Sequence, residues 1–353
     1  MGKYYDGLND ELKAYFKILS PEFPEWLNDY IETPAMQRIA GISLSCGMDY
    51  TKLFNVKYWY SNLEHSVGVA LIIWHFTHDK KQTLAGLFHD IATPTFKHCI
   101  DFMNGDSEKQ ESTEERTEQI IKNSNEIMLL LDRDNIKIEE VSDYKMYPIA
   151  DNDTPKLSAD RFEYTFSSGL VLHRVWELDL IKECYENVII LKNEEGIDEL
   201  GFKDIEVCEK YIKIISELWP VWISDKDRTA MQFLADIVKS MNRKGYITID
   251  DLYKFSEAQI IEKILNCDDN YIKDNFIKFQ NTTNIYAGEI EVQDKYCVSV
   301  KAKKRYIIPL VKYNGEIKRI NEVSKEAELN IKKYLSIKQS EHTWFDFDFK
   351  PYN

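Results

Sequence analysis

The chain is long, acidic and lacks an obvious membrane-spanning segment. It has 353 residues, with 45 Lys and Arg against 60 Asp and Glu, which gives a formal net charge of −15. This length accommodates one large helical domain with an appendage, and no apolar run reaches the roughly 18 residues that a membrane helix needs. The acidic balance argues against general nucleic-acid binding, although a small anion can still bind in a locally basic pocket.

The cysteines and the N-terminal sequence indicate a reducing compartment. The six cysteines are scattered without a CxxC pair, and the first residues contain no apolar signal core. These features are typical of a protein without disulfides or a secretory leader. We therefore expect a cytoplasmic protein that does not associate with membranes.

Helical patterns dominate residues 1–280. Thr33 and Pro34 fit the N-cap and first position of a helix in TPAMQRIAGISL. Two apolar helices follow, one that starts near His65 and one that ends near His89. Further helices are expected over about 157–192 and 204–242, and within TIDDLYKFSEAQIIEKIL.

An acidic, glycine-containing stretch interrupts these helices at residues 101–118, DFMNGDSEKQESTEERTE. We predict a solvated surface loop there. Because it follows the His-Asp pair closely, it could also close over a site as a lid.

Residues 281–353 predict a small α+β part. Short alternating runs replace the helical periodicity, and Asn314-Gly315 is a typical type I′ hairpin turn. The segment TWFDFDF predicts a strand with one aromatic face, for burial or for contact between subunits.

The segment LAGLFHDIATPTFKH places a His-Asp pair at the end of an apolar helix. Imidazole and carboxylate ligands suit a divalent transition metal, and ligands at the start of one helix and the end of the next converge when the helices pack antiparallel. His65, His89 and Asp90 meet this requirement, and Asp160 in LSADRFEYT is a fourth candidate. A lone helical histidine is more often a hydrogen-bonded core or surface residue, so the prediction depends on the ordered set.

The order of these four residues resembles the H…HD…D signature of the HD-domain metal-dependent phosphohydrolases. The surrounding motifs resemble those of one branch, the deoxynucleoside triphosphate triphosphohydrolases. They occur in the same order as in that branch and at similar spacing: MQRIAGI, NLEHSVGVA, HDIATPTFKH and DRFEYT. The resemblance implies a mainly α HD-domain fold with an α+β C-terminal appendage, assembled as a homo-oligomer.

The resemblance also implies roles for individual residues. His65, His89, Asp90 and Asp160 would bind one divalent ion, which could be Mn, Fe, Ni, Co or Zn and less readily Mg. A second set would line the pocket. His98 matches a histidine of the same motif, Arg161 a phosphate-facing lysine, and Tyr164 an aromatic residue near the sugar. Arg38 would contact the substrate or form an ion pair that fixes its helix.

Several residues depart from the motifs of that branch. Asn62 stands in place of a phosphate-contacting arginine, Thr93 in place of a histidine, Thr113 in place of a candidate catalytic histidine, and Ser168 in place of an acidic residue. Asparagine and threonine form hydrogen bonds but supply no cation and do not titrate near neutral pH. The metal ligands are therefore predicted together with an altered triphosphate-handling shell.

Two further clusters have open interpretations. Glu114 and Glu115 could replace the missing acid or base if the loop folds over the metal. Lys301, Lys303 and Arg305 alternate along one predicted strand, where a solvated edge is the default. An accessory nucleotide or phosphate site at a subunit interface is the alternative, because the resembling branch forms oligomers with regulatory nucleotides.

These features predict a metal-dependent phosphohydrolase that acts on a nucleotide or another small phosphoester through a metal-bound water. The alternatives are a dNTP triphosphohydrolase that releases tripolyphosphate and a non-catalytic nucleotide-binding sensor. The candidate catalytic residues are Asp90, Arg161 and His98, and the candidate substrate-binding residues are Arg161, Tyr164, Asn62, Thr93 and Arg38.

Overall fold

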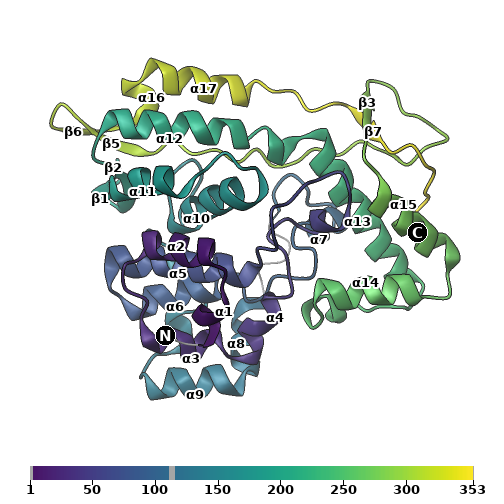
Figure 1. The fold of residues 1–353 in the computed structure, drawn as a ribbon, viewed down its shortest axis with the longest axis horizontal. Coiled ribbons are helices and arrows are strands. Elements are labelled where there is room, and N and C mark those ends of the chain that lie inside the picture. Colours follow the sequence, from purple (N-terminus) through teal and green to yellow (C-terminus); the bar gives the residue numbers. More distant parts are fainter. Residues whose placement is uncertain (1–2, 111–115, 353) are drawn as a thin grey trace.

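An antiparallel helix pair lies at the centre of the N-terminal half. The computed structural model describes residues 3–110 and 116–352 (Figure 1). In it α5 (Asn62–Thr77) and α6 (Lys80–Phe88) pack closely together, separated by His78 in a left-handed conformation and by Asp79, which caps α6. The apolar runs read from the sequence form this pair, and most side chains of both helices are buried.

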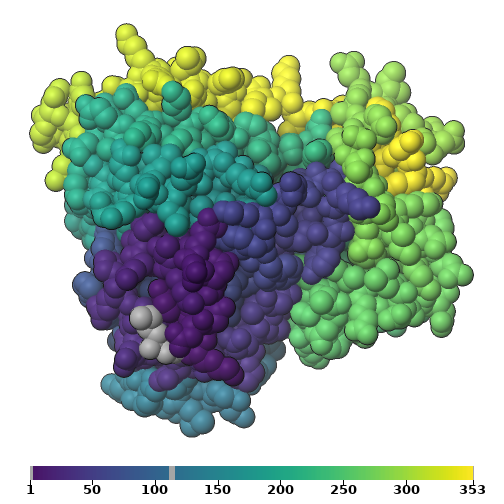
Figure 2. Space-filling model, in the orientation of Figure 1, coloured from purple at the N-terminus to yellow at the C-terminus, as the bar shows by residue number. Residues whose placement is uncertain are grey.

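Other helices surround this pair and extend the core toward the C-terminus. α2, α4 and α10 pack against α5, and α12 packs against α17 along one edge of the molecule (Figures 1 and 2). The bounds are α1 (Lys3–Gly7), α2 (Asp10–Leu19), α3 (Glu25–Ile31), α4 (Pro34–Ile39), α7 (Cys99–Met103), α8 (Thr117–Asn123), α9 (Asn125–Arg133), α10 (Ala159–Ser167), α11 (Leu178–Glu186), α12 (Ile205–Leu218), α13 (Asp225–Arg243), α14 (Glu257–Asn266), α15 (Asn270–Asn281), α16 (Ile320–Val323) and α17 (Lys325–Leu335).

A four-stranded sheet joins the two predicted parts of the chain. Its order is β1 (Val188–Lys192), β2 (Asp198–Phe202), β5 (Leu310–Tyr313) and β6 (Glu316–Arg319). β2 and β5 are parallel, and the two outer pairs are antiparallel. The expected helix up to residue 192 is therefore wrong at its end. The division of the chain at residue 280 stays a prediction. The sheet contains strands from both sides of that position.

The predicted hairpin turn is confirmed. Asn314 and Gly315 have φ of 50° and 81° between β5 and β6, the left-handed values that a type I′ turn needs. The strand predicted through Lys301 and Arg305 is wrong, because residues 299–309 have no strand assignment. Lys303 and Arg305 instead line the pocket described below, and Lys301 pairs with Glu341.

A three-stranded sheet covers α13 near the C-terminus, in the order β3 (Tyr286–Gly288), β7 (His342–Trp344), β4 (Cys297–Val298). The strand predicted in TWFDFDF ends at Trp344. Phe345 and Phe349 are buried and pack on the ring of Phe233 from α13. The aromatic face is thus used for burial within the chain.

The acidic segment at residues 101–118 is a loop only in part. α7 includes its first residues, and Asp101 is completely buried. Thr113, Glu114 and Glu115 lie outside the described residues, so the lid and its acid/base role stay predictions. Within the described ranges no helix has both the length and the apolar character needed to cross a membrane.

The loop that carries the His-Asp motif is anchored to the segment before α14. The Thr95 hydroxyl donates hydrogen bonds to the carbonyls of Leu252 and Phe255 at 3.0 and 2.9 Å. At the start of α14, Glu257 is fully buried and accepts a hydrogen bond from the Ser43 amide at 3.2 Å. Burial raises the pKa of Glu257 well above its usual value.

We predict that Glu257→Gln makes the protein more stable at pH 8 and has a smaller effect at pH 5. Folding raises the pKa of this carboxyl group, so the folded protein retains a proton that the unfolded chain loses above about pH 4.5. Its contribution to stability therefore falls as the pH rises, and glutamine removes that dependence. Thermal denaturation between pH 5 and 8 measures the difference, and superimposable profiles of the two proteins would contradict the prediction.

Candidate metal centre

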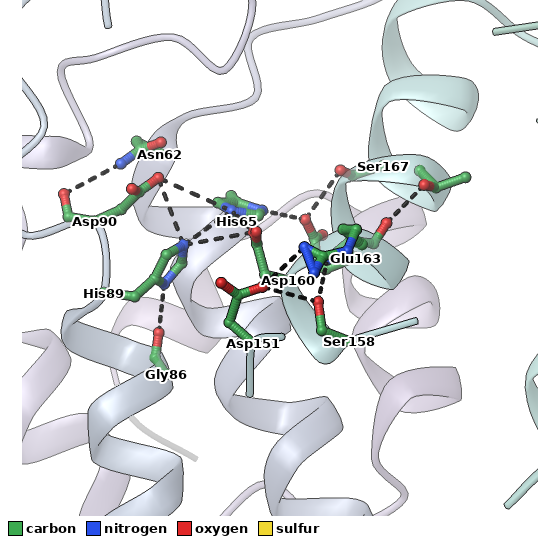
Figure 3. Close-up of polar contacts among 12 residues, drawn as sticks. Asn62, His65, Gly86, His89, Asp90, Asp151, Ser158, Asp160, Glu163 and Ser167 are labelled. Atoms are coloured by element: carbon green, nitrogen blue, oxygen red, sulfur yellow. Dashed lines mark hydrogen bonds and ion pairs between the residues drawn. The ribbon is translucent and has the colours of Figure 1, made fainter. Parts of the chain in front are cut away.

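Three helix ends bring predicted ligands together. His65 lies in the first turn of α5, which Ser61 caps, and His89 ends α6. Asp160 lies in the first turn of α10, which Ser158 caps. Because α5 packs against both α6 and α10, the three side chains meet (Figure 3).

The ligand atoms are separated by distances that suit a single ion. His65 Nε2 lies 3.2 Å from His89 Nε2 and 3.1 Å from Asp160 Oδ1, and His89 Nε2 lies 3.7 Å from Asp160 Oδ1. Ligands bound about 2.1 Å from one ion are roughly 3 to 3.5 Å apart in octahedral or tetrahedral geometry. Among the described residues these three form a group whose ligand atoms all lie within 4.8 Å of one another.

Asp90 stands slightly apart from this group. Its Oδ2 lies 3.6 Å from His89 Nε2 and 3.9 Å from His65 Nε2, but only 3.0 Å from Nζ of Lys97. The carboxylate is therefore shared between the two imidazoles and the ammonium group. Its role as a fourth ligand stays a prediction.

Hydrogen bonds at Nδ1 orient both imidazoles. His65 Nδ1 is bonded to Glu163 Oε2, and His89 Nδ1 lies 2.6 Å from the Gly86 carbonyl, to which it can donate (Figure 3). A metal-bound histidine normally donates its other ring N–H to such an acceptor, which leaves Nε2 for the ion. Two oriented Nε2 atoms and a carboxylate form a donor set that fits a divalent transition metal.

Glu163 is a fully buried carboxylate that supports the centre from α10. Its Oε1 accepts hydrogen bonds from Tyr15 and Tyr60 at 3.1 and 2.6 Å, and its Oε2 accepts one from Ser167 at 3.1 Å. Gly68 on α5 leaves room for it, because a Cβ atom there would lie 2.7 Å from Glu163 Cγ. The glycine in the sequence HSVG thus permits the close approach of α10.

The charges of the cluster favour bound cations. Burial lowers the pKa of His65, but Glu163 and Asp160 together raise it to about 9. Burial raises the pKa of Asp160, whereas the hydrogen bond from His65 and the nearby imidazole charges lower it to about 2. Burial likewise raises the pKa of Asp90, and Lys97 and the histidines bring it well below its usual value. Asp160 and Asp90 are thus ionised, and the His65 imidazole beside them holds a proton.

A pocket of about 980 Å³ includes the cluster in its wall. Its lining contains several basic side chains from separate segments, among them Lys97, Lys156, Arg161, Lys303 and Arg305. Tyr164 also lines it and forms an edge-to-face pair with Trp222, at 5.3 Å between ring centroids. Thr93 and Ser168, which depart from the motifs of the resembling branch, also line the pocket.

Arg161 and His98 line the pocket with their polar groups already engaged. Arg161 Nη1 donates to Asp151 Oδ1 at 3.0 Å, and Nε donates to a backbone carbonyl. His98 Nδ1 lies 3.0 Å from Asp101 Oδ2, and its Nε2 lies 3.2 Å from Nη2 of Arg305. Their roles toward a substrate stay predictions.

Asn62 and Arg38 are not among the residues that line the pocket. Asn62 is fully buried, and its amide nitrogen lies 3.4 Å from the Asp90 carbonyl. Arg38 donates to the carbonyls of Ile91 and Thr93 at 2.9 and 2.7 Å. Arg38 therefore holds the loop after the His-Asp pair by hydrogen bonds to backbone carbonyls. The sequence had suggested an ion pair or a substrate contact for this residue.

Three residues of the site were not assigned to it from the sequence. Glu163 follows Asp160 by three positions, and this helical spacing is the signal that could have placed both side chains on one face. Lys97 stands within the quoted motif, directly before His98. Arg305 was considered only as part of a strand edge or an interface, because its approach to the motif is a long-range contact.

Comparisons with known proteins support the fold. No protein-family profile matches the chain. It is 25% identical over 324 residues to the uncharacterised protein YdhJ of Bacillus subtilis, which covers 88% of this chain and 94% of that protein. These values indicate a similar protein of nearly the same length.

Two solved structures share the architecture. A hypothetical protein from Aquifex aeolicus has a TM-score of 0.62 and 17% identity, over 91% of this chain and 92% of that one. A phosphohydrolase from Bacteroides thetaiotaomicron also has a TM-score of 0.62, with 14% identity over 92% of this chain and 96% of that one. The fold is therefore common to all three nearly throughout.

We predict that the affinity for a divalent metal rises with pH by up to tenfold per unit below about pH 9. In the metal-free protein His65 holds a proton up to a pKa of about 9, and a metal can bind only the unprotonated Nε2. Calorimetric titration with Mn²⁺ in buffers of different ionisation enthalpy counts the proton released. Binding without proton release at pH 7 would contradict this account.

We predict that Glu163→Gln weakens metal binding by roughly 10- to 100-fold while the protein stays folded. Glutamine keeps the size of the side chain but removes the charge that orients and polarises His65. Competition with a metal-chelating dye measures the affinity, and circular dichroism monitors the fold. Unchanged affinity would show that Glu163 serves only packing.

Proposed function

We propose that this chain is a metal-dependent phosphohydrolase of the HD type, acting on a nucleotide or another small phosphoester. The observation that carries the proposal is the convergence of His65, His89 and Asp160 in the wall of a pocket that also contains lysine and arginine side chains. The fold shared with a phosphohydrolase supports it, as does the order of the sequence motifs. Those motifs also suggest Asp90 as a fourth ligand.

The residues of the pocket suit this chemistry. His65, His89 and Asp160, with Asp90, would hold one divalent ion, and such an ion lowers the pKa of a bound water and acts as a Lewis acid toward a phosphoryl oxygen. Basic side chains in the wall attract and orient an anionic group. We propose that Arg161, fixed by Asp151, faces that group in the pocket.

The dimensions favour a small substrate. About 980 Å³ is at the upper end of the range for small-ligand pockets, so a whole nucleotide can enter. The ring of Tyr164, supported edge-to-face by Trp222, offers an aromatic surface for a sugar or a base. We propose neither a nucleic acid nor a membrane as partner, and the homo-oligomer stays a prediction.

We predict that the metal-loaded protein releases orthophosphate or a linearised nucleotide from at least one member of a panel of nucleoside mono-, di- and triphosphates and cyclic nucleotides. Phosphorus NMR identifies the products after loading with Mn, Fe, Co or Mg. Asp160→Ala should lower turnover by roughly 100-fold or more, because it removes a metal ligand. Asp179→Ala is the matched control, since Asp179 has the same place in the first turn of α11 and is exposed.

Other products would point to the alternatives. Tripolyphosphate that disappears in Asp160→Ala would identify a dNTP triphosphohydrolase and show that Asn62 and Thr93 do not prevent that reaction. Saturable nucleotide binding without turnover under any metal would contradict the hydrolase and favour the sensor.

A further inference from the structure

An ammonium group lies beside the candidate metal centre. Lys97 Nζ is 3.0 Å from Asp90 Oδ2, the carboxylate oxygen that faces both histidines, and it donates a hydrogen bond to Asn62 Oδ1. Lys97 is only 7% exposed but lines the pocket. A buried lysine normally has a specific partner or function, because removing its charge from water is costly.

The backbone holds this side chain in place at a cost. Phe96 and Lys97 have φ of 65° and 45°, in the left-handed region that non-glycine residues rarely adopt. The turn is fixed by the two hydrogen bonds of the Thr95 hydroxyl and by the complete burial of the Phe96 ring. Two consecutive residues of this kind beside a pocket are typical of a functional site that the surrounding structure stabilises.

The contacts of Lys97 keep its charge available. The neutral Asn62 carbonyl holds the ammonium group without cancelling its charge, and Asp90 is shared with the two histidines. An ammonium group has three N–H donors, and the side chains of the described residues accept two of them from Lys97. Because Lys97 lines the pocket, the third donor can reach a ligand there.

We infer that Lys97 binds an oxygen of the substrate's phosphoryl group next to the ion, and that Asn62 positions it. This inference rests on the proposed function and deepens it, because it assigns the anion-binding group beside the metal. A charge-assisted N–H···O bond to the phosphoryl group adds to the attraction of the ion. Lys97 lies in the loop after the His-Asp pair. It thus supplies a cation that contacts Asn62 of α5.

The test is the affinity of the Mn²⁺-loaded protein for inorganic phosphate, measured by calorimetry alongside the affinity for Mn²⁺ itself. Lys97→Met should weaken phosphate binding by roughly 10- to 100-fold, and Lys97→Arg should retain part of it. Mn²⁺ should bind Lys97→Met at least as tightly as the unmodified protein, since a neighbouring positive charge is gone. Lys81→Met is the control, because Lys81 pairs with Glu140 outside the pocket.

A second variant tests the same point without removing the lysine. Asn62→Asp keeps the size of the side chain and the contact with Nζ, but its carboxylate neutralises the ammonium group. It should also weaken phosphate binding, by about tenfold or more. Unchanged phosphate affinity in this variant would contradict the inference even if Lys97→Met does not fold.

Three results would overturn the inference. The first is an unchanged phosphate affinity in Lys97→Met. The second is a loss of Mn²⁺ binding in that variant, which would show that Lys97 only supports Asp90. The third is that the unmodified protein does not bind phosphate. Failure of the proposed function looks different: phosphate binds through Lys97, but no substrate is hydrolysed. Turnover that persists in Lys97→Met with unchanged phosphate affinity would contradict only the inference.

Discussion

The bond between the Glu163 carboxylate and His65 Nδ1 is the contact on which the centre depends, because it joins α10 to α5 inside the core. It places Asp160, one turn earlier on α10, beside the two histidines. It also depends on Gly68, because a Cβ atom there would collide with the Glu163 side chain. A buried carboxylate that also accepts bonds from two tyrosines is well satisfied, so the same group provides both packing and a fixed imidazole.

Charge is distributed very differently at the centre and over the whole chain. The net charge of −15 would repel an anionic substrate at long range, and salt screens that repulsion beyond about 10 Å. Within the pocket, Lys97, Lys303 and Arg305 come from distant parts of the sequence to the same space. Cations near the candidate metal centre can therefore attract a small anion locally, although the whole chain is acidic. The C-terminal segment contributes directly, through Arg305 against His98.

The sequence predicted the elements that depend on local pattern. Apolar periodicity identified α5 and α6, and Asn314-Gly315 identified the β5–β6 hairpin. The apolar run of β1 was read as helix, because short apolar runs fit either structure and pairing with β2 decides between them. Asn62 was interpreted as the loss of a cation, yet Lys97 lies against it from 35 positions along the chain. Such compensation between segments cannot be read from either segment alone.

The most direct test of the central claim is the position of the metal in crystals of the Mn²⁺-loaded protein. Anomalous scattering at the manganese edge locates the ion independently of any activity. The account predicts one strong peak within bonding distance of His65 Nε2, His89 Nε2 and an Asp160 oxygen, and none at that position in Asp160→Ala. A peak elsewhere, or none with the protein saturated, would contradict a metal centre at these residues.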